Sequence, residues 1–154
     1  MKKHNGIRPQ DVVILLKIVA CFNRHTHEID RFGKVQPFSA PKKKSVAEQL
    51  LISPSEVTES LARSAYGGLY DSGSERVMNR SLLEFLQYGL KYVFPQQPGA
   101  LVRGIPTAHS AKPLSDLIQA NEHYVWPDAD GTVRGQAIEP LYHTVVKAVG
   151  SDPL

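Results

Sequence analysis

The sequence predicts an α+β protein that is mainly helical, with a helical N-terminal domain over residues 1–95 and a small C-terminal α/β appendage over residues 96–154. Three observations lead to this prediction. Apolar residues recur at helical spacing through most of the N-terminal domain. Serine, proline and glutamate residues mark helix starts in the same region. The appendage contains a repeated hairpin-like unit and is expected to complete the core or a dimer interface.

The composition is that of an ordinary globular protein, and 154 residues are enough to bury a core. The net charge of +3 and the pI near 9.0 permit a local nucleic-acid-binding patch without requiring one. No apolar run approaches the ~20 residues of a membrane span. Because no cleavage site follows the basic N-terminus, we expect a cytoplasmic protein. Cys21 is the single cysteine, which excludes an intramolecular disulfide.

The first predicted helix begins at Pro9. Its apolar residues cover most of the helix circumference, which predicts burial in the core or in a dimer interface. These residues are Val12, Val13, Ile14, Leu15, Leu16, Ile18, Val19 and Phe22. Several of them are β-branched, so a strand is an alternative for part of the segment. The length of the segment and the position of Asp11 near its start favour the helix.

Residues 23–41 form a polar, irregular stretch that contains His25, His27 and Asp30. Imidazole and carboxylate groups at this spacing can bind a metal ion. A second set of ligands at matching spacing is missing, so a surface loop is the preferred interpretation. We expect no bound metal.

The helix that begins after Ser53 is the element around which the N-terminal domain is organised. Ser53 is a favourable N-cap residue, because its hydroxyl can accept a hydrogen bond from an otherwise free backbone N–H. Pro54 suits the first helical position, and Glu56 completes a capping box. Val57 and Leu61 lie one turn apart and give the helix a face to bury.

A shorter helix precedes it and is separated from it by residues 51–53. Val46, Ala47 and Leu50 form the apolar face of this shorter helix, and the small Ala47 lets the second helix cross close by. Two short helices joined by a short turn have the geometry of a helix-turn-helix. The second helix of that motif can enter the major groove of DNA.

The helix-turn-helix of bacterial winged-helix transcription regulators resembles the segment SVAEQLLISPSEV at residues 45–57. The two are similar at the small Ala47, the apolar Ile52 and the buried Val57. They differ at Leu51, where that family usually has glycine. The resemblance covers at most residues 1–95 and is specific over about 20 of them. It implies a winged helix-turn-helix fold, binding to double-stranded DNA, and a homodimer that regulates transcription.

The exposed side of the second helix is the predicted DNA-contacting face. Ser55 and Thr58 can meet base edges or phosphates, Ala62 can touch a thymine methyl group, and Glu59 can accept a hydrogen bond from cytosine. Arg63, at the edge of this face, is best placed to contact a phosphate. The predicted DNA-contacting residues are Lys42, Lys43, Lys44, Ser53, Ser55, Thr58, Glu59, Ala62, Arg63, Arg76 and Arg80.

Each basic residue in this set has a plainer interpretation. The lysine run can be a solvated loop, and Arg76 and Arg80 can be solvated surface residues. Glu59 and Arg63, four residues apart, can be only a helix-stabilising pair. The alternative function is a winged helix that binds a partner protein, such as an antitoxin-like or phage-encoded adaptor, without binding DNA.

Gly67 predicts the end of this helix. A short hairpin is predicted over residues 69–78, which is where the winged-helix family has its wing. Ser81, followed three residues later by Glu84, predicts a second capping box, and Pro95 stops the helix that begins there.

The last third contains two similar segments, residues 92–104 and 124–135. Each holds tyrosine, valine, an aromatic residue and proline, and then a short strand that ends in arginine and glycine. The two copies are expected to pair in one small sheet, followed by a helix over residues 140–149. Arg103 and Arg134 occupy equivalent positions. They can bind an anion or form a salt bridge with a partner subunit, and the structural role is preferred.

No group of residues in the sequence predicts catalysis. Ser110 lies beside His109 but lacks the glycines of a nucleophile elbow, and there is no glycine-rich phosphate-binding loop. His123 and His143 are scattered along the chain. We therefore expect neither enzymatic activity nor a cofactor.

Overall fold

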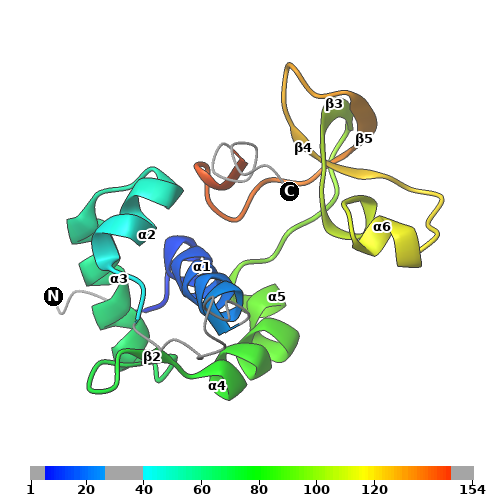
Figure 1. Ribbon diagram of the computed structural model, residues 1–154. Coiled ribbons are helices and arrows are strands. Elements are labelled where there is room, and N and C mark those ends of the chain that lie inside the picture. The colour runs from blue at the N-terminus through cyan, green and yellow to red at the C-terminus, as the bar shows by residue number, and fades with distance from the viewer. Residues whose placement is uncertain (1–5, 27–39, 147–154) are drawn as a thin grey trace, which may run out of the picture. The chain divides into compact units, whose positions relative to one another are not determined.

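The computed structural model describes residues 6–26 and 40–146 and shows an α+β protein (Figure 1). The chain divides into two compact units. The first contains the described residues up to Leu90 together with those from Leu141 onward, and the second runs from Lys91 to Pro140. No described helix combines the length and the apolar character that crossing a lipid bilayer requires.

The first unit is built around α1 (Pro9–Thr26), α2 (Lys43–Leu50) and α3 (Pro54–Tyr66). The predicted first helix is therefore confirmed, and the strand alternative for it is wrong. Figure 1 shows α1 in the middle of this unit, with α2 and α3 along one side of it. A two-stranded antiparallel hairpin, β1 (Tyr70–Asp71) and β2 (Arg76–Val77), follows α3 where the hairpin was predicted.

The core of the first unit consists of apolar side chains from these helices, from the hairpin and the residue before it, and from the helical segment that follows the hairpin. Its buried members are Ile14, Leu15, Ile18, Val46, Ala47, Leu50, Val57, Leu61, Leu69, Tyr70 and Leu82. Burying one side chain of this size stabilises a fold by about 1.5–3 kcal/mol. Val57 and Leu61 are thus turned inward as predicted, and the opposite side of α3 faces away from the core.

The helical segment after the hairpin begins three residues earlier than predicted, with Met78 in place of Ser81 at the N-cap position. α4 spans Asn79–Glu84, and the Met78 carbonyl accepts its first hydrogen bond, from the Leu82 N–H at 2.8 Å. The predicted capping box of Ser81 with Glu84 is wrong, because the hairpin runs directly into the helix and Ser81 lies inside it. The segment continues through a π-helical turn, η1 (Phe85–Gly89), into α5 (Leu90–Val93).

A buried ion pair connects α1 to α3. Asp11 is fully buried, and its carboxylate oxygens accept hydrogen bonds from Arg63, at 2.8 Å from Nη2 and 3.0 Å from Nε. The Arg63 side chain is only 11% exposed. Hydrogen bonding to Asp11 raises the pKa of Arg63 above its ordinary value. Arg63 was predicted to contact a phosphate, and that prediction is wrong because its guanidinium is held inside the protein.

The turn between α2 and α3 passes through Leu51, which adopts a left-handed backbone conformation with φ of 57°. The Leu51 N–H donates to the Glu48 carbonyl at 3.3 Å, and the Ile52 N–H donates to the Ala47 carbonyl at 3.0 Å, which closes the end of α2. Glycine adopts this conformation without steric cost. The winged-helix regulators that this segment resembles usually have glycine at the position of Leu51, where the chain adopts this conformation.

The second unit is a small closed barrel of β3 (Leu101–Pro106), β4 (Tyr124–Pro127) and β5 (Val133–Ala137). Strand β3 pairs antiparallel with both of the others, and β4 pairs parallel with β5. A 3-10 turn, η2 (Ala108–Ser110), and α6 (Leu114–Leu117) lie between β3 and β4. The two repeat copies thus meet in one sheet as predicted, although residues 92 and 93 belong to α5.

Glycine is required where the strands of this barrel cross. A Cβ atom at Gly104 would overlap the backbone carbonyl of Trp126, and one at Gly135 would overlap the carbonyl of His123. Both glycines are buried. The arginine that precedes each glycine therefore points to the opposite, outer side of its strand.

The predicted helix over residues 140–149 differs in its start. Residues 141–144 form bends and turns, helical backbone begins at Val145, and residues 147–149 lie outside the described part of the chain. Tyr142 belongs to the first unit, where its hydroxyl oxygen accepts a hydrogen bond from the Gln10 side chain at 3.1 Å.

We expect Arg63→Ala to lower the free energy of unfolding of the first unit by about 3–5 kcal/mol, because it leaves the buried carboxylate of Asp11 unpaired. Urea unfolding followed by far-UV circular dichroism measures this change. The double variant Asp11→Asn/Arg63→Met should lose less than the sum of its single changes. As a control, Glu59→Gln removes only the exposed 3.8 Å contact to Arg63 and should cost about 0.5 kcal/mol or less. A cost of only about 0.5 kcal/mol for Arg63→Ala would contradict the stabilising role of the buried Asp11–Arg63 ion pair.

We expect Leu51→Gly to raise the free energy of unfolding by about 0.5–1 kcal/mol. The change removes a left-handed strain of about 1–2 kcal/mol and gives back part of it as the extra chain entropy of glycine. Leu51 is 58% exposed, so little packing is lost. Leu51→Ala keeps the Cβ atom and should not stabilise, and equal melting temperatures of the two variants would refute the explanation.

Candidate nucleic-acid interface

The N-terminus of α3 is fixed by the predicted capping box. The Glu56 N–H donates to the Ser53 hydroxyl oxygen at 3.2 Å, and the Ser53 N–H donates to a Glu56 carboxylate oxygen at 2.8 Å. The Ser53 hydroxyl also donates to the same carboxylate oxygen at 2.8 Å. Ser53 was predicted among the DNA-contacting residues, and the structure gives its hydroxyl a capping role at the start of the helix.

These hydrogen bonds stabilise the ionised form of Glu56. The backbone N–H of Ser53, and then its hydroxyl, lower the pKa of Glu56 below its ordinary value, and a hydrogen bond from Gln10 at 3.4 Å adds to the effect. The Gln10 side chain extends from the first turn of α1, so the cap of α3 is also connected to that helix.

The exposed face of α3 carries mainly small, uncharged side chains together with one carboxylate. Ser55, Thr58, Glu59 and Ala62 are all exposed, as predicted from the helical periodicity. The Thr58 hydroxyl donates to the Pro54 carbonyl at 3.1 Å, which leaves its lone pairs free to accept a hydrogen bond. With Arg63 turned inward, Glu59 is the charged residue among these predicted contacts.

Tyr66 is 81% exposed at the C-terminal end of the same face, as the helical periodicity predicts, and its hydroxyl can donate a hydrogen bond. The burial of two serines on α3 was not found from the sequence. Ser60 and Ser64 are buried, and their hydroxyls have no hydrogen-bond partner within the described part of the chain. The four-residue spacing of Val57, Leu61 and Ala65 already indicates the buried side, and the two serines lie beside it.

The predicted lysine run lies at the N-terminus of α2. Lys42 occupies the N-cap position, gives no side-chain cap, and is exposed together with Lys43 and Lys44. The first turn of α2 has no acidic residue. Positive charge at this end opposes the helix dipole, and the free N–H groups there favour an anion. The contact from Lys44 to Glu48 is 4.0 Å long and exposed, so it holds that lysine weakly.

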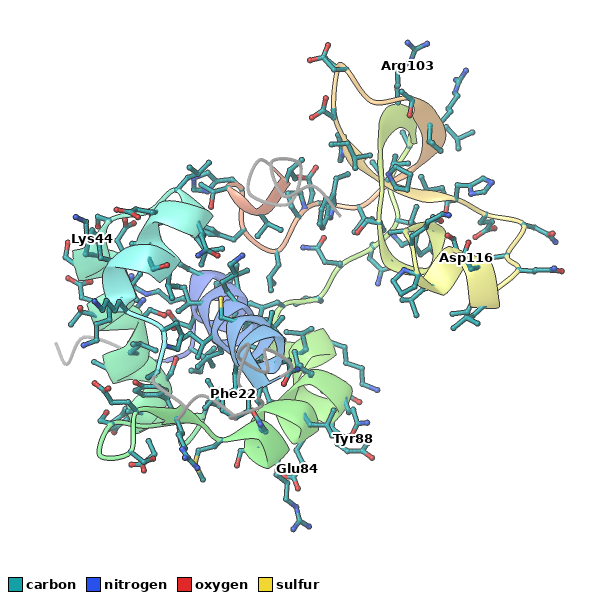
Figure 2. The ribbon with its side chains drawn as sticks, viewed as in Figure 1. Phe22, Lys44, Glu84, Tyr88, Arg103 and Asp116 are labelled. Carbon is teal, nitrogen blue, oxygen red and sulfur yellow. The ribbon has the colours of Figure 1, made fainter. Side chains whose placement is uncertain are left out.

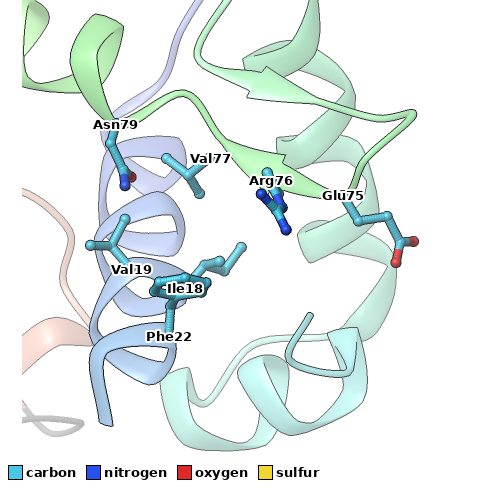
Figure 3. Close-up of a pocket in the computed structure, with 7 residues that line it drawn as sticks. All are labelled: Ile18, Val19, Phe22, Glu75, Arg76, Val77 and Asn79. Atoms are coloured by element: carbon cyan, nitrogen blue, oxygen red, sulfur yellow. The ribbon is translucent and has the colours of Figure 1, made fainter. Parts of the chain in front are cut away.

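The predicted arginines beyond the hairpin have different environments. Arg80 is 94% exposed and lies 3.7 Å from Glu84. Arg76 lines a pocket between the hairpin and α1, together with Ile18, Val19, Phe22, Glu75, Val77 and Asn79 (Figure 3). The apolar wall of this pocket comes mainly from α1. Both arginines are exposed, so each can reach a phosphate group.

The remaining candidates from the sequence are the metal site and the His109–Ser110 pair. They hold no group of three or more histidine, cysteine, aspartate or glutamate side chains that could bind a metal ion. His27 and Asp30 lie outside the described residues, so the metal hypothesis at His25 stays a hypothesis. His109 contacts the Glu122 carbonyl oxygen at 2.8 Å, and the Ser110 hydroxyl accepts the Tyr124 N–H at 2.9 Å. The second contact holds η2 against β4, and the first holds it against the residues just before β4.

We expect the free energy of unfolding to fall more steeply on acidification for the wild type than for Glu56→Gln. The folded-state pKa of Glu56 is lowered, so its ionised form contributes stability above the unfolded pKa of about 4.3. This contribution is lost as the pH falls through the folded pKa. Urea unfolding between about pH 7 and pH 3 measures the difference. Glu122→Gln, an exposed control, should follow the wild-type curve. Parallel curves for wild type and Glu56→Gln would contradict the prediction.

Comparisons with known proteins add no evidence on function. No protein-family model, no curated protein and no solved structure matches the chain. The case for a function therefore depends on the exposed face of α3, the lysines of α2 and the chemistry of the second unit.

Proposed function

We propose that the protein is a sequence-specific DNA-binding regulator of transcription, and that α3 is its recognition helix in a winged helix-turn-helix. One observation carries the proposal. Helix α3 begins at a complete capping box, is held on α1 and α2 by its buried residues, and presents Ser55, Thr58 and Ala62 to solvent. A helix supported on one side and free on the other can enter the major groove, which is about 12 Å wide.

The small side chains of this face allow the backbone of α3 to approach base edges closely. Serine and threonine hydroxyls can donate to or accept from base-edge groups, and an alanine methyl group can contact the methyl of thymine. Glu59 can accept a hydrogen bond from the amino group of cytosine, and its charge would disfavour closely placed phosphates. Sequence preference would therefore come from Ser55, Thr58, Glu59 and Ala62.

Phosphate contacts would come from outside α3. Lys42, Lys43 and Lys44 lie at the uncapped start of α2, where free N–H groups and positive charge both favour an anion. In helix-turn-helix proteins the first helix of the motif crosses the DNA backbone. Arg80, at 94% exposure, can add a contact beyond the hairpin. Without Arg63 the expected number of phosphate contacts is small, so the affinity should depend moderately on salt.

A homodimer fits this function. Two copies related by a two-fold axis would present two recognition helices to half-sites one helical turn, about 34 Å, apart. Size-exclusion chromatography with light scattering tests the dimer directly, with and without DNA.

A protein-binding module is the second candidate. Leu83 is 53% exposed and Tyr88 is 69% exposed on the helical segment that follows the hairpin. Exposed aromatic and aliphatic side chains are typical of protein contacts. Purification of one stoichiometric partner protein without DNA would favour this candidate.

We expect Ser55→Ala/Thr58→Ala to weaken binding to a DNA fragment from upstream of the protein's own gene by about 10–100-fold. Each lost hydroxyl contact should cost about 0.7–1.4 kcal/mol, which is near or below the lower end of the range for a bidentate base contact. Fluorescence anisotropy over a range of salt concentrations measures the affinity. Ser115→Ala/Thr132→Ala removes two exposed hydroxyls of the second unit and serves as the matched control. Replacing Lys42, Lys43 and Lys44 with glutamine should reduce the salt slope by about 2.7. The DNA proposal would be contradicted if the affinity did not change with salt concentration. It would also be contradicted if Ser55→Ala/Thr58→Ala bound DNA as tightly as Ser115→Ala/Thr132→Ala.

A further inference from the structure

The outer side of the β3–β4–β5 barrel carries two arginines that face each other across paired strands. Arg103 of β3 and Arg134 of β5 are direct register partners in the antiparallel pairing. Their Cβ atoms are therefore about 4.5–5.5 Å apart on the same face. Both side chains are exposed, and Figure 2 shows Arg103 projecting outward from the strands. Like charges placed directly opposite each other destabilise a sheet.

No carboxylate of the described chain forms an ion pair with either arginine. Within the described residues, neither guanidinium takes part in an ion pair or a side-chain hydrogen bond. Asp128 is close enough for its N–H to donate to the Arg103 carbonyl at 3.2 Å. Its carboxylate, however, accepts the N–H of Asp130 at 2.8 Å. The two arginines therefore form an exposed double cation that an external anion can neutralise.

An aromatic side chain shares this face. Val125 is fully buried, so its neighbours Tyr124 and Trp126 point to the other side of β4. Trp126 is the register partner of Ile105, which lies two residues after Arg103 on the same side of β3. The Tyr124 ring is packed edge-on against His109, with ring centres 4.6 Å apart. Trp126 remains partly exposed.

We propose that this arginine face, consisting of Arg103, Trp126 and Arg134, binds single-stranded nucleic acid. The planar guanidinium groups hold phosphate oxygens through paired hydrogen bonds, and the indole stacks on a base. An acidic peptide or free phosphate would use the arginines alone. A duplex keeps its bases stacked on one another, so the indole favours a single strand. The proposal concerns the second unit and does not depend on the function proposed for α3.

Trp126 provides a local signal for the test, because it is the single tryptophan of the chain. The full-length protein is titrated with an oligonucleotide of about 16 nucleotides, and tryptophan fluorescence is recorded together with the anisotropy of a labelled strand. We expect quenching on binding. Arg103→Gln/Arg134→Gln should weaken binding at least about tenfold and reduce the salt slope by about 1.4, the value for two phosphate contacts on a single strand.

The matched control is Lys91→Gln/Lys112→Gln, which removes the same net charge from the same unit. Lys91 lies 5.0 Å from the centre of the Tyr92 ring, and Lys112 is paired with Asp116 at 3.9 Å. This control should bind within about twofold of wild type, since distant exposed charges are screened by salt. Far-UV circular dichroism of both double variants verifies that they are folded.

Three outcomes would overturn the proposal. The first is equal affinity of the arginine and lysine double variants. The second is equal competition by polyglutamate or inorganic phosphate, which would assign the face to another anion. The third is binding without a change in Trp126 fluorescence. The Ser55→Ala/Thr58→Ala variant should quench like wild type, so failure of the α3 proposal and failure of this one give different results.

Discussion

The buried ion pair between Asp11 and Arg63 is the contact on which the arrangement of the first unit depends. Apolar packing between α1 and α3 is non-directional and tolerates small rotations of one helix on the other. Two hydrogen bonds from one guanidinium to one carboxylate, at 2.8 and 3.0 Å, do not tolerate such rotations. They fix the rotation of α3 about its axis, and this rotation decides which side chains meet solvent.

That constraint also sets the electrostatics of the candidate interface. Because Arg63 points inward, the outer face of α3 keeps hydroxyls, a methyl group and the carboxylate of Glu59. Such a face can discriminate between bases but contributes little attraction to a polyanion. In the proposed complex with DNA, the attraction would have to come from the lysines at the start of α2. Base reading and phosphate binding would then be divided between two helices.

The second unit depends on a different constraint, which is the close crossing of its strands. Gly104 and Gly135 let backbone carbonyls approach to distances that a side chain would prevent. Since side chains alternate along a strand, the residue before each glycine must point outward. This explains why the repeat ends in arginine and glycine together: the glycine is needed for closure, and the arginine occupies the adjacent outward position. The antiparallel pairing of β3 with β5 then places the two arginines opposite each other.

Local chemistry made much of the first unit predictable. The capping box at Ser53, the buried Val57 and Leu61 and the short hairpin follow from neighbouring residues, and each was found. Two errors have different causes. The helical periodicity placed Arg63 at the edge of the exposed face, and the pairing with Asp11, 52 residues away, turned it inward. Ser81 and Glu84 have capping spacing, but the hairpin positions Met78 to begin the helix first.

The register of the barrel was equally beyond a sequence argument. The repeat predicted that two copies would share a sheet, but it did not say which residues would be paired. Arg103 and Arg134 become informative only once they are known to be opposite each other, because an isolated exposed arginine is ordinary. Their pairing converts two common surface residues into a concentrated positive charge.

The lysines of α2 and the arginines of the barrel share one property that separates them from ordinary surface charge. Each group occupies a place where its charge opposes the local structure: Lys42–Lys44 lie at the positive end of a helix dipole, and Arg103 faces a like charge across a strand pair. Neither place needs a basic residue for folding, since an acidic or neutral side chain would be more favourable in both. Local rules are most often broken where function requires it. An anionic partner would offset the unfavourable interaction of the lysines with the helix dipole and the repulsion between the two arginines. The residues that weaken the free protein would therefore stabilise its complex.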